Sequence, residues 1–169
     1  MNLTLHPIVK GILSILAVTV IGFFLLNLAF ILDALFQGLI DAVVSIFYPI
    51  DYDMLFNYEA VYWYPPLKHG LFVVLIGIIS WYVFRSKLGD VWKATYMVVP
   101  MATVLLTIGI FTSVLPGALW PLVSISLGTL FTLVVLYYLY RTKQPWIYYY
   151  SAMAMALTML MVVLFGVEI

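Results

Sequence analysis

The side chains that can do chemistry concentrate between residues 27 and 69 of this 169-residue chain. Asp33, Gln37 and Asp41 recur every four residues, so on a helix they share one face. Together with the polar and aromatic residues that follow, they form a candidate ligand-binding set: Asn27, Asp33, Gln37, Asp41, Asp51, Asp53, Glu59, Trp63 and His69. Carboxylates, an imidazole and an aromatic face suit acid–base chemistry, a hard cation or a small polar solute.

Asp33 and Asp41 are the acids that share this face, and two neighbouring carboxylates can share a proton. They are two helical turns apart, about 12 Å along one helix, which is too far for direct sharing. An aspartyl dyad would need one of them to meet an acid from the following loop. Otherwise they form the solvated polar face of an interfacial helix, so we assign no catalytic residue.

Metal and cofactor chemistry has little support in this sequence. Asp51, Asp53 and Glu59 lie close together, but the glycine and the alternating ligands of a calcium loop are absent. An acidic mouth that concentrates cations explains these residues as well. His69 and His6 are the only histidines and lie at opposite ends of the candidate bundle. This chain alone therefore offers no bis-histidine haem or His-rich zinc site, and we predict no metal site and name no cofactor.

The composition indicates which elements must position these residues. Hydrophobic residues make up 66% of the chain and charged residues 8%, whereas a soluble domain carries about 25% charged residues. In lipid each segment must satisfy its own backbone hydrogen bonds, which requires helices. We therefore predict an all-α polytopic integral membrane helical bundle that forms one domain over residues 1–169. The lipid bilayer is its surroundings, and the chain has no basic patch suited to nucleic acid.

Uncharged runs predict about five transmembrane helices, since a span needs about 20 apolar residues. The Pro116-Gly117 turn divides the longest run into two. The predicted spans are residues 11–32, 68–84, 94–115, 118–140 and 145–167. Pro100 and Pro121 are expected to kink the third and fourth spans.

Residues 34–48 do not fit this count. They predict an outer amphipathic helix, which either lies on the membrane surface or extends the first span beyond the membrane. An outer loop over residues 49–67 follows. A sixth span is possible, but it requires a turn near Asn27, where the sequence has neither proline nor glycine.

The charges are sorted between the two ends of the predicted spans. Six of the seven basic residues fall on one side: Lys10, Arg85, Lys87, Lys93, Arg141 and Lys143. Six of the seven acids fall on the other: Asp33, Asp41, Asp51, Asp53, Glu59 and Glu168. Basic residues concentrate in cytoplasmic loops, so we predict a multi-pass cell-membrane protein with a cytoplasmic N-terminus and an extracytoplasmic C-terminus.

Small residues recur at intervals of four in the last two spans, where they let helix backbones approach closely. Ser124, Gly128 and Thr132 share one such face, and Ala152 and Ala156 share another. We expect these faces to pack against other spans of this chain or against another protein.

These features lead to three hypotheses for the function. The first is a non-enzymatic membrane subunit that binds or admits a small solute at an outer polar vestibule, together with a membrane-protein partner or a second copy. The second is a structural or assembly subunit of a larger membrane complex. The third is a membrane enzyme that acts on a lipid-linked substrate at the outer interface.

Overall fold

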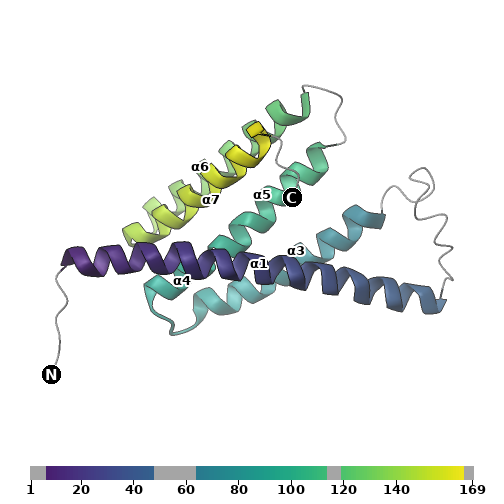
Figure 1. Cartoon of the computed structure of the whole chain (residues 1–169), viewed down its shortest axis with the longest axis horizontal. Coiled ribbons are helices and arrows are strands. Elements are labelled where there is room, and N and C mark those ends of the chain that lie inside the picture. Colours follow the sequence, from purple (N-terminus) through teal and green to yellow (C-terminus); the bar gives the residue numbers. More distant parts are fainter. Residues whose placement is uncertain (1–6, 48–63, 114–118, 166–169) are drawn as a thin grey trace.

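The computed structural model describes residues 7–47, 64–113 and 119–165, which are almost entirely helical (Figure 1). In chain order the helices are α1 (Pro7–Phe47), α3 (Tyr64–Arg85), α4 (Asp90–Tyr96), α5 (Val98–Thr112), α6 (Leu119–Arg141) and α7 (Trp146–Phe165). Over the described residues, five helical stretches are long and apolar enough to cross a membrane, with α4 and α5 together forming one of them. The predicted all-α membrane bundle is confirmed.

The α4–α5 pair is the buried centre of the bundle. Within its most apolar stretch 50% of the residues are buried, against 11 to 28% in the other four spans, so the other helices surround it. Val18 of α1, Leu139 of α6 and Ala152 of α7 join its side chains in the main core. The outward surfaces of the surrounding helices carry large apolar side chains, which is the surface that lipid requires.

Two prolines behave differently because of their positions. Helices α4 and α5 are separated at Met97, and Pro100 lacks the N–H that would bond the carbonyl of Tyr96. The structure thus has a break where a Pro100 kink was expected. Pro121 lies in the first turn of α6, where backbone N–H groups have no helical partner, and α6 continues unbroken. The expected kink at Pro121 is wrong for that reason.

Helix α1 is a single helix of 41 residues with no turn near Asn27. Its length is about 60 Å, roughly twice the hydrocarbon thickness of a bilayer. Residues 34–47 continue the first span instead of forming a separate helix or turning back as a sixth span. Asp33 and Asp41 contact α3, whereas Leu35 and Leu39 are exposed. The acids of this segment therefore face the bundle, and its outer surface is apolar.

Helix α1 crosses the other helices obliquely and extends past them at both ends (Figure 1). Near one end the hydroxyls of Thr19 and Tyr150 are 2.8 Å apart, which joins α1 to the start of α7. Near the other end Asp41 pairs with Lys68, close to the start of α3. The part between Thr19 and Asp41 is about 33 Å long, close to one bilayer thickness. The ends of α1 outside this part form two overhangs.

Helix α1 ends at Phe47 instead of 32, whereas the described boundaries of the other spans differ from the predictions by a few residues. Helix α3 begins at Tyr64 instead of 68, so the last residues assigned to the outer loop are helical. Prolines at 65 and 66 suit this first turn, since a proline there forfeits no helical hydrogen bond. Of the predicted segments, residues 48–63, 114–118 and 166–167 lie outside the described residues.

Helix α1 approaches the central pair closely at Gly22. A Cβ atom at this position would lie 3.0 Å from Cγ2 of Val98 and 3.8 Å from the carbonyl oxygen of Thr95. Val98 is buried and β-branched, so its side chain has little freedom to move away. We expect Gly22→Ala to lower the free energy of unfolding by about 1–3 kcal/mol, as overpacking does, in thermal unfolding measured in mild detergent.

Gly11→Ala is the matched control on the same helix, because a Cβ atom there would meet nothing within 4 Å. This control should be neutral or slightly stabilising, since alanine is the better helix former. A Gly22→Ala protein that unfolds at the same temperature as the wild type would contradict the close packing of α1.

Candidate functional site

A polar junction lies where α1, α3 and α5 meet. Its six residues are Asp33 and Asp41 of α1, Tyr64, Lys68 and His69 of α3, and Thr107 of α5. Each acid of α1 pairs with one base of α3, so the two acids are not an aspartyl dyad. The adjacent bases reach acids two turns apart because α1 crosses obliquely and the lysine side chain is long.

Asp41 is the more accessible of the two acids, with 40% of its side chain exposed. Nζ of Lys68 donates to both of its carboxylate oxygens at 2.9 Å. The hydroxyl of Tyr64 donates to Oδ1 at 2.7 Å, and Nζ of Lys68 lies 4.8 Å from the centre of the Tyr64 ring. Burial, followed by the hydrogen bond to Asp41 and its negative charge, raises the pKa of Tyr64 to about 12. Tyr64 therefore remains a donor at neutral pH.

Asp33 is more deeply placed, with 14% of its side chain exposed. Its Oδ2 lies 3.5 Å from Nδ1 of His69, whose side chain is 5% exposed. The other ring nitrogen, Nε2, lies 3.0 Å from Oγ1 of Thr107. Oγ1 of Thr107 in turn donates to the carbonyl oxygen of Thr103 at 2.6 Å. This chain of contacts joins α1, α3 and α5.

A small cavity of about 10 Å³ adjoins Asp33 and His69. Its other walls are the apolar side chains of α1, α3 and α5 and the hydroxyl-bearing Thr103. This volume suits about one water molecule. Within the described part of the chain, Oδ1 of Asp33 is buried and has no hydrogen-bond partner. Because the cavity has a volume of only about 10 Å³, it is too small for a solute larger than water.

The remaining members of the predicted ligand set are not brought into this junction. Asn27 is exposed on α1, and its amide donates to the carbonyl oxygen of Phe23 at 2.8 Å. Gln37 is half-buried on α1. Asp51, Asp53, Glu59 and Trp63 lie outside the described residues. Among the residues described, no three His, Asp or Glu side chains are placed to hold a metal ion.

The sequence did not single out Thr107, Lys68 or Tyr64 as site residues. Lys68 and His69 begin the second predicted span, on the same side of the membrane as the two acids of residues 33–41. This placement was a usable signal that Lys68 pairs with one of these acids. Thr107 gave no signal, since hydroxyls in these helices commonly bond their own backbone, as those of Thr112 and Thr132 do.

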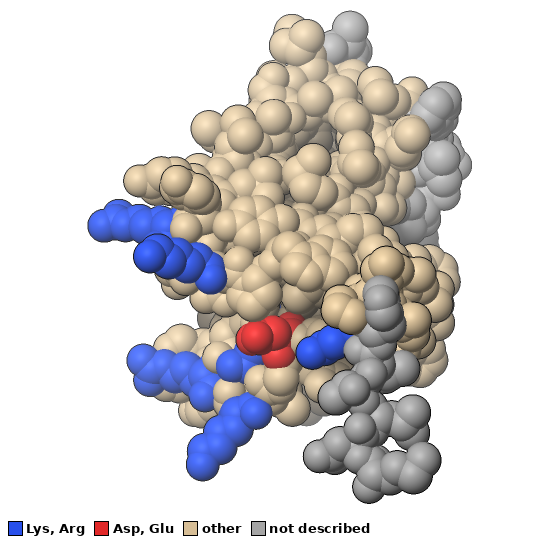
Figure 2. Space-filling model, turned by 90° about the vertical axis from the view of Figure 1, so that its left-hand side faces the viewer, with Lys and Arg blue, Asp and Glu red and all other residues tan. Residues whose placement is uncertain are grey.

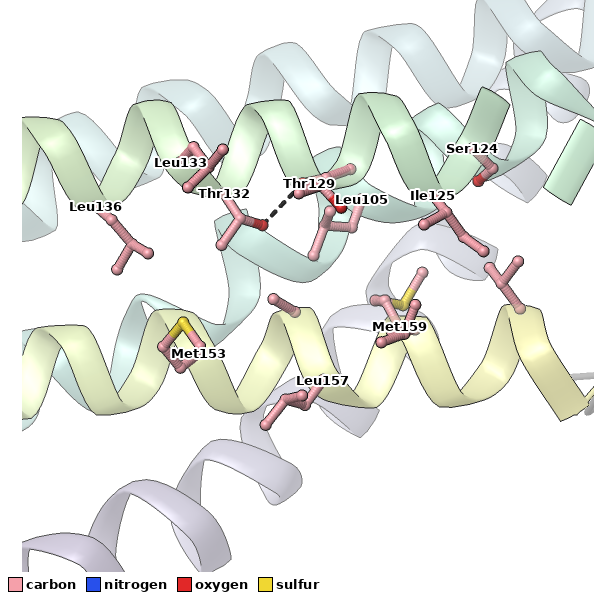
Figure 3. A pocket seen from close by; sticks show the side chains of 14 residues that line it. Leu105, Ser124, Ile125, Thr129, Thr132, Leu133, Leu136, Met153, Leu157 and Met159 are labelled. Atoms are coloured by element: carbon pink, nitrogen blue, oxygen red, sulfur yellow. Dashed lines mark hydrogen bonds between the residues drawn. The ribbon is translucent and has the colours of Figure 1, made fainter. Parts of the chain in front are cut away.

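A second feature is an apolar groove between α6 and α7, with a volume of about 260 Å³ (Figure 3). The lining includes Leu105 of α5 and small or flexible side chains of the two helices: Ser124, Gly128, Thr132, Met153, Ala156 and Met159. A Cβ atom on Gly128 would lie 3.3 Å from Cδ2 of Leu105, so α6 approaches α5 closely here. Ala152 is fully buried in the core. The small residues of α6 and α7 thus have other helices of this chain as neighbours.

A third feature is an exposed small-residue face on the outer half of α1, formed by Ala34, Gly38 and Ala42. These residues recur every four positions, and a Cβ atom on Gly38 would meet nothing within 4 Å. Leu35 and Leu39 beside them are 65% and 62% exposed. The spacing of Ala34, Gly38 and Ala42 is present in the sequence, but this face was not among the predicted packing faces.

These features define a multi-pass helical membrane protein with a polar junction between α1, α3 and α5. Comparison with known protein families, with curated proteins and with solved structures finds no match. The function must therefore be inferred from the geometry.

The Tyr64–Asp41 hydrogen bond gives the junction a measurable pH dependence. Tyr64→Phe keeps the ring and removes one donor, and because Asp41 is partly exposed we expect a loss of about 1 kcal/mol at neutral pH. The pKa of Tyr64 rises from 10.0 to about 12 on folding. The contribution of the Tyr64 hydroxyl to the free energy of unfolding is complete below pH 10 and is lost as the pH rises through 12. The midpoint of thermal unfolding at pH 9 and pH 11 measures this dependence.

The wild type should lose more stability than Tyr64→Phe between these two pH values. Tyr138→Phe is the control, because Tyr138 is 63% exposed on α6. Equal losses in the wild type and the Tyr64→Phe protein would show that this hydroxyl does not carry the effect.

Proposed function

We propose that this chain is a non-enzymatic structural or assembly subunit of a larger membrane complex, and that the outer half of α1 docks a partner membrane protein. The supporting observation is the length and exposure of α1. The helix is about 60 Å long and carries exposed large apolar side chains from Ile8 to Phe47.

The length of α1 exceeds what one bilayer accommodates. A 60 Å helix confined to a 30 Å hydrocarbon core would need a tilt of about 60°, whereas spanning helices tilt by about 0–40°. At a smaller tilt, the overhangs expose apolar side chains to headgroups or water, which is unfavourable. A partner that covers an overhang removes this cost.

The small-residue face gives the outer half of α1 a suitable contact surface. Lipid supplies no hydrophobic drive between helices, so helices associate where small residues permit close backbone packing. Ala34, Gly38 and Ala42 offer this on the exposed side. Asp41 lies on a neighbouring face of α1, where it pairs with Lys68 and fixes α1 against α3. The junction thereby holds the small-residue face outward.

We also propose that the N-terminus is cytoplasmic, the C-terminus is extracytoplasmic and the membrane is the cell membrane. Six of the seven basic residues belong to one end of the bundle, and Figure 2 shows Lys and Arg gathered on the face at that end. Basic residues favour the cytoplasmic side. Lys68, the seventh, is paired with Asp41 at the other end.

Solute binding is the second candidate, and one observation favours it. Oδ1 of Asp33 has no partner within the described helices and lies in a residue that lines a cavity. That cavity has about 10 Å³, which suits water better than a larger solute. We therefore rank solute binding below assembly.

Gly38→Leu tests the docking surface. A Cβ atom at Gly38 meets nothing within 4 Å, so we expect the fold to be retained while close approach by a partner helix is blocked. We expect the partner recovered with the tagged protein from its native membrane, extracted in mild detergent, to fall at least tenfold. Native mass spectrometry of the purified material measures the ratio of partner to subunit.

Gly11→Leu is the matched control, because Gly11 also lies on α1 with open space around it but has Pro7 and Ile15 as its neighbours four residues away. This variant should retain the partner. Equal recovery with both variants, or a wild type that is monomeric, would contradict docking on this face. A complex made only of this chain would replace the partner protein with a second copy.

A further inference from the structure

We propose that Asp33 and His69 form a proton-binding site, which holds one proton between α1, α3 and α5 in the folded protein. This goes beyond assembly, because it assigns a ligand to the deeper half of the polar junction. The contacts on the two sides of the His69 ring, the burial of Asp33 and the placement of the other charges each support it.

The hydrogen bonds fix the state of Nε2 of His69. A hydroxyl has one hydrogen, and that of Thr107 is directed to the carbonyl oxygen of Thr103 at 2.6 Å. Oγ1 of Thr107 can then only accept from Nε2, which lies 3.0 Å away. Nε2 therefore carries a hydrogen, and the tautomer protonated on Nδ1 alone is excluded.

The other nitrogen, Nδ1, faces Oδ2 of Asp33 at 3.5 Å. If the ring is an imidazolium, Nδ1 carries a second hydrogen and pairs with an ionised carboxylate. If the carboxyl group is protonated, its hydrogen faces the lone pair on Nδ1. Without either proton, a carboxylate that is largely buried faces a lone pair and has no counter-charge, which is strongly unfavourable. Each of the two favourable states contains one proton between the two side chains. The states differ in whether this proton is bound to Nδ1 of His69 or to Oδ2 of Asp33.

No other described charge neutralises Asp33. On α3, Nζ of Lys68 lies 2.9 Å from each oxygen of Asp41, and the hydroxyl of Tyr64 bonds Asp41 as well. Helix α5 contains no titratable side chain. On α1, the next acid is Asp41, two turns away and already paired. A proton shared with His69 is the charge compensation that the described helices provide for Asp33.

The adjoining cavity has room for a further hydrogen-bond partner of Asp33. Its volume of about 10 Å³ suits one water molecule next to Asp33, whose Oδ1 is otherwise unbonded in the described structure. A water molecule there would donate to Oδ1 of Asp33. Without this proton, an uncompensated carboxylate would face a lone pair where α1 and α3 meet.

The chain has two histidines, so His6→Gln leaves His69 as the one ring to observe. The first measurement is ¹⁵N NMR of histidine-labelled His6→Gln protein in lipid nanodiscs at pH 7. The second is the infrared difference spectrum between this protein and the same protein carrying Asp33→Asn, at the same pH. We expect Nε2 to be protonated, with either a second ring proton on Nδ1 or a carboxylic-acid band that Asp33→Asn abolishes. A neutral ring beside an ionised Asp33, or a ring protonated on Nδ1 alone, would overturn the proposal.

Two further variants separate this site from a general effect on the fold. Asp41→Asn removes the neighbouring carboxylate and should leave the signals of His69 unchanged. An equal change in Asp41→Asn and Asp33→Asn would overturn the assignment to Asp33. If Asp33→Asn fails to fold, Thr107→Val preserves the shape of the side chain and removes the acceptor. It should shift the Nε2 resonance, and an unchanged resonance would overturn the proposed tautomer.

Discussion

The buried α4–α5 pair is the element on which the other helices depend, and the approach of α1 at Gly22 determines how the longest helix lies across it. Because a glycine meets Val98 there, α1 lies close to the central pair and crosses it obliquely. The oblique crossing produces both the overhangs of α1 and the encounter of its acids with α3. The polar junction and the exposed face that we propose as a docking surface therefore both depend on this packing contact.

Helix α1 also shows how a bilayer reverses the polarity expected of a surface helix. In water the acids of an amphipathic helix face the solvent and its apolar residues face the core. Here Asp33 and Asp41 face α3, while Leu35 and Leu39 are exposed. Acids that face other helices require charge compensation, which Asp41 obtains from Lys68 and Asp33 from His69. Exposed apolar residues beyond the bilayer thickness require a covering surface, which we assign to a partner protein.

The sequence predicted the fold class and a count of about five spans, because lipid demands long uncharged helices and charges interrupt them. It left open whether residues 34–48 lie on the surface or extend the first span, since periodicity does not reveal what a face contacts. The pairing of Asp33 with His69 was also out of reach. Which turn of α1 meets α3 depends on the crossing at Gly22 and Val98, a contact between residues far apart in the chain.

The continuity of α1 is the central claim, because the junction, the overhangs and the exposed face all require it. The chain has no cysteine, so spin labels at Leu13→Cys and Ile46→Cys, both on exposed positions of α1, report one clean distance by pulsed electron paramagnetic resonance in nanodiscs. A single helix predicts a separation of about 50 Å between the labelled backbone positions. A separation near 10 Å, typical of two adjacent packed helices, would show a turn near Asn27 and contradict the account.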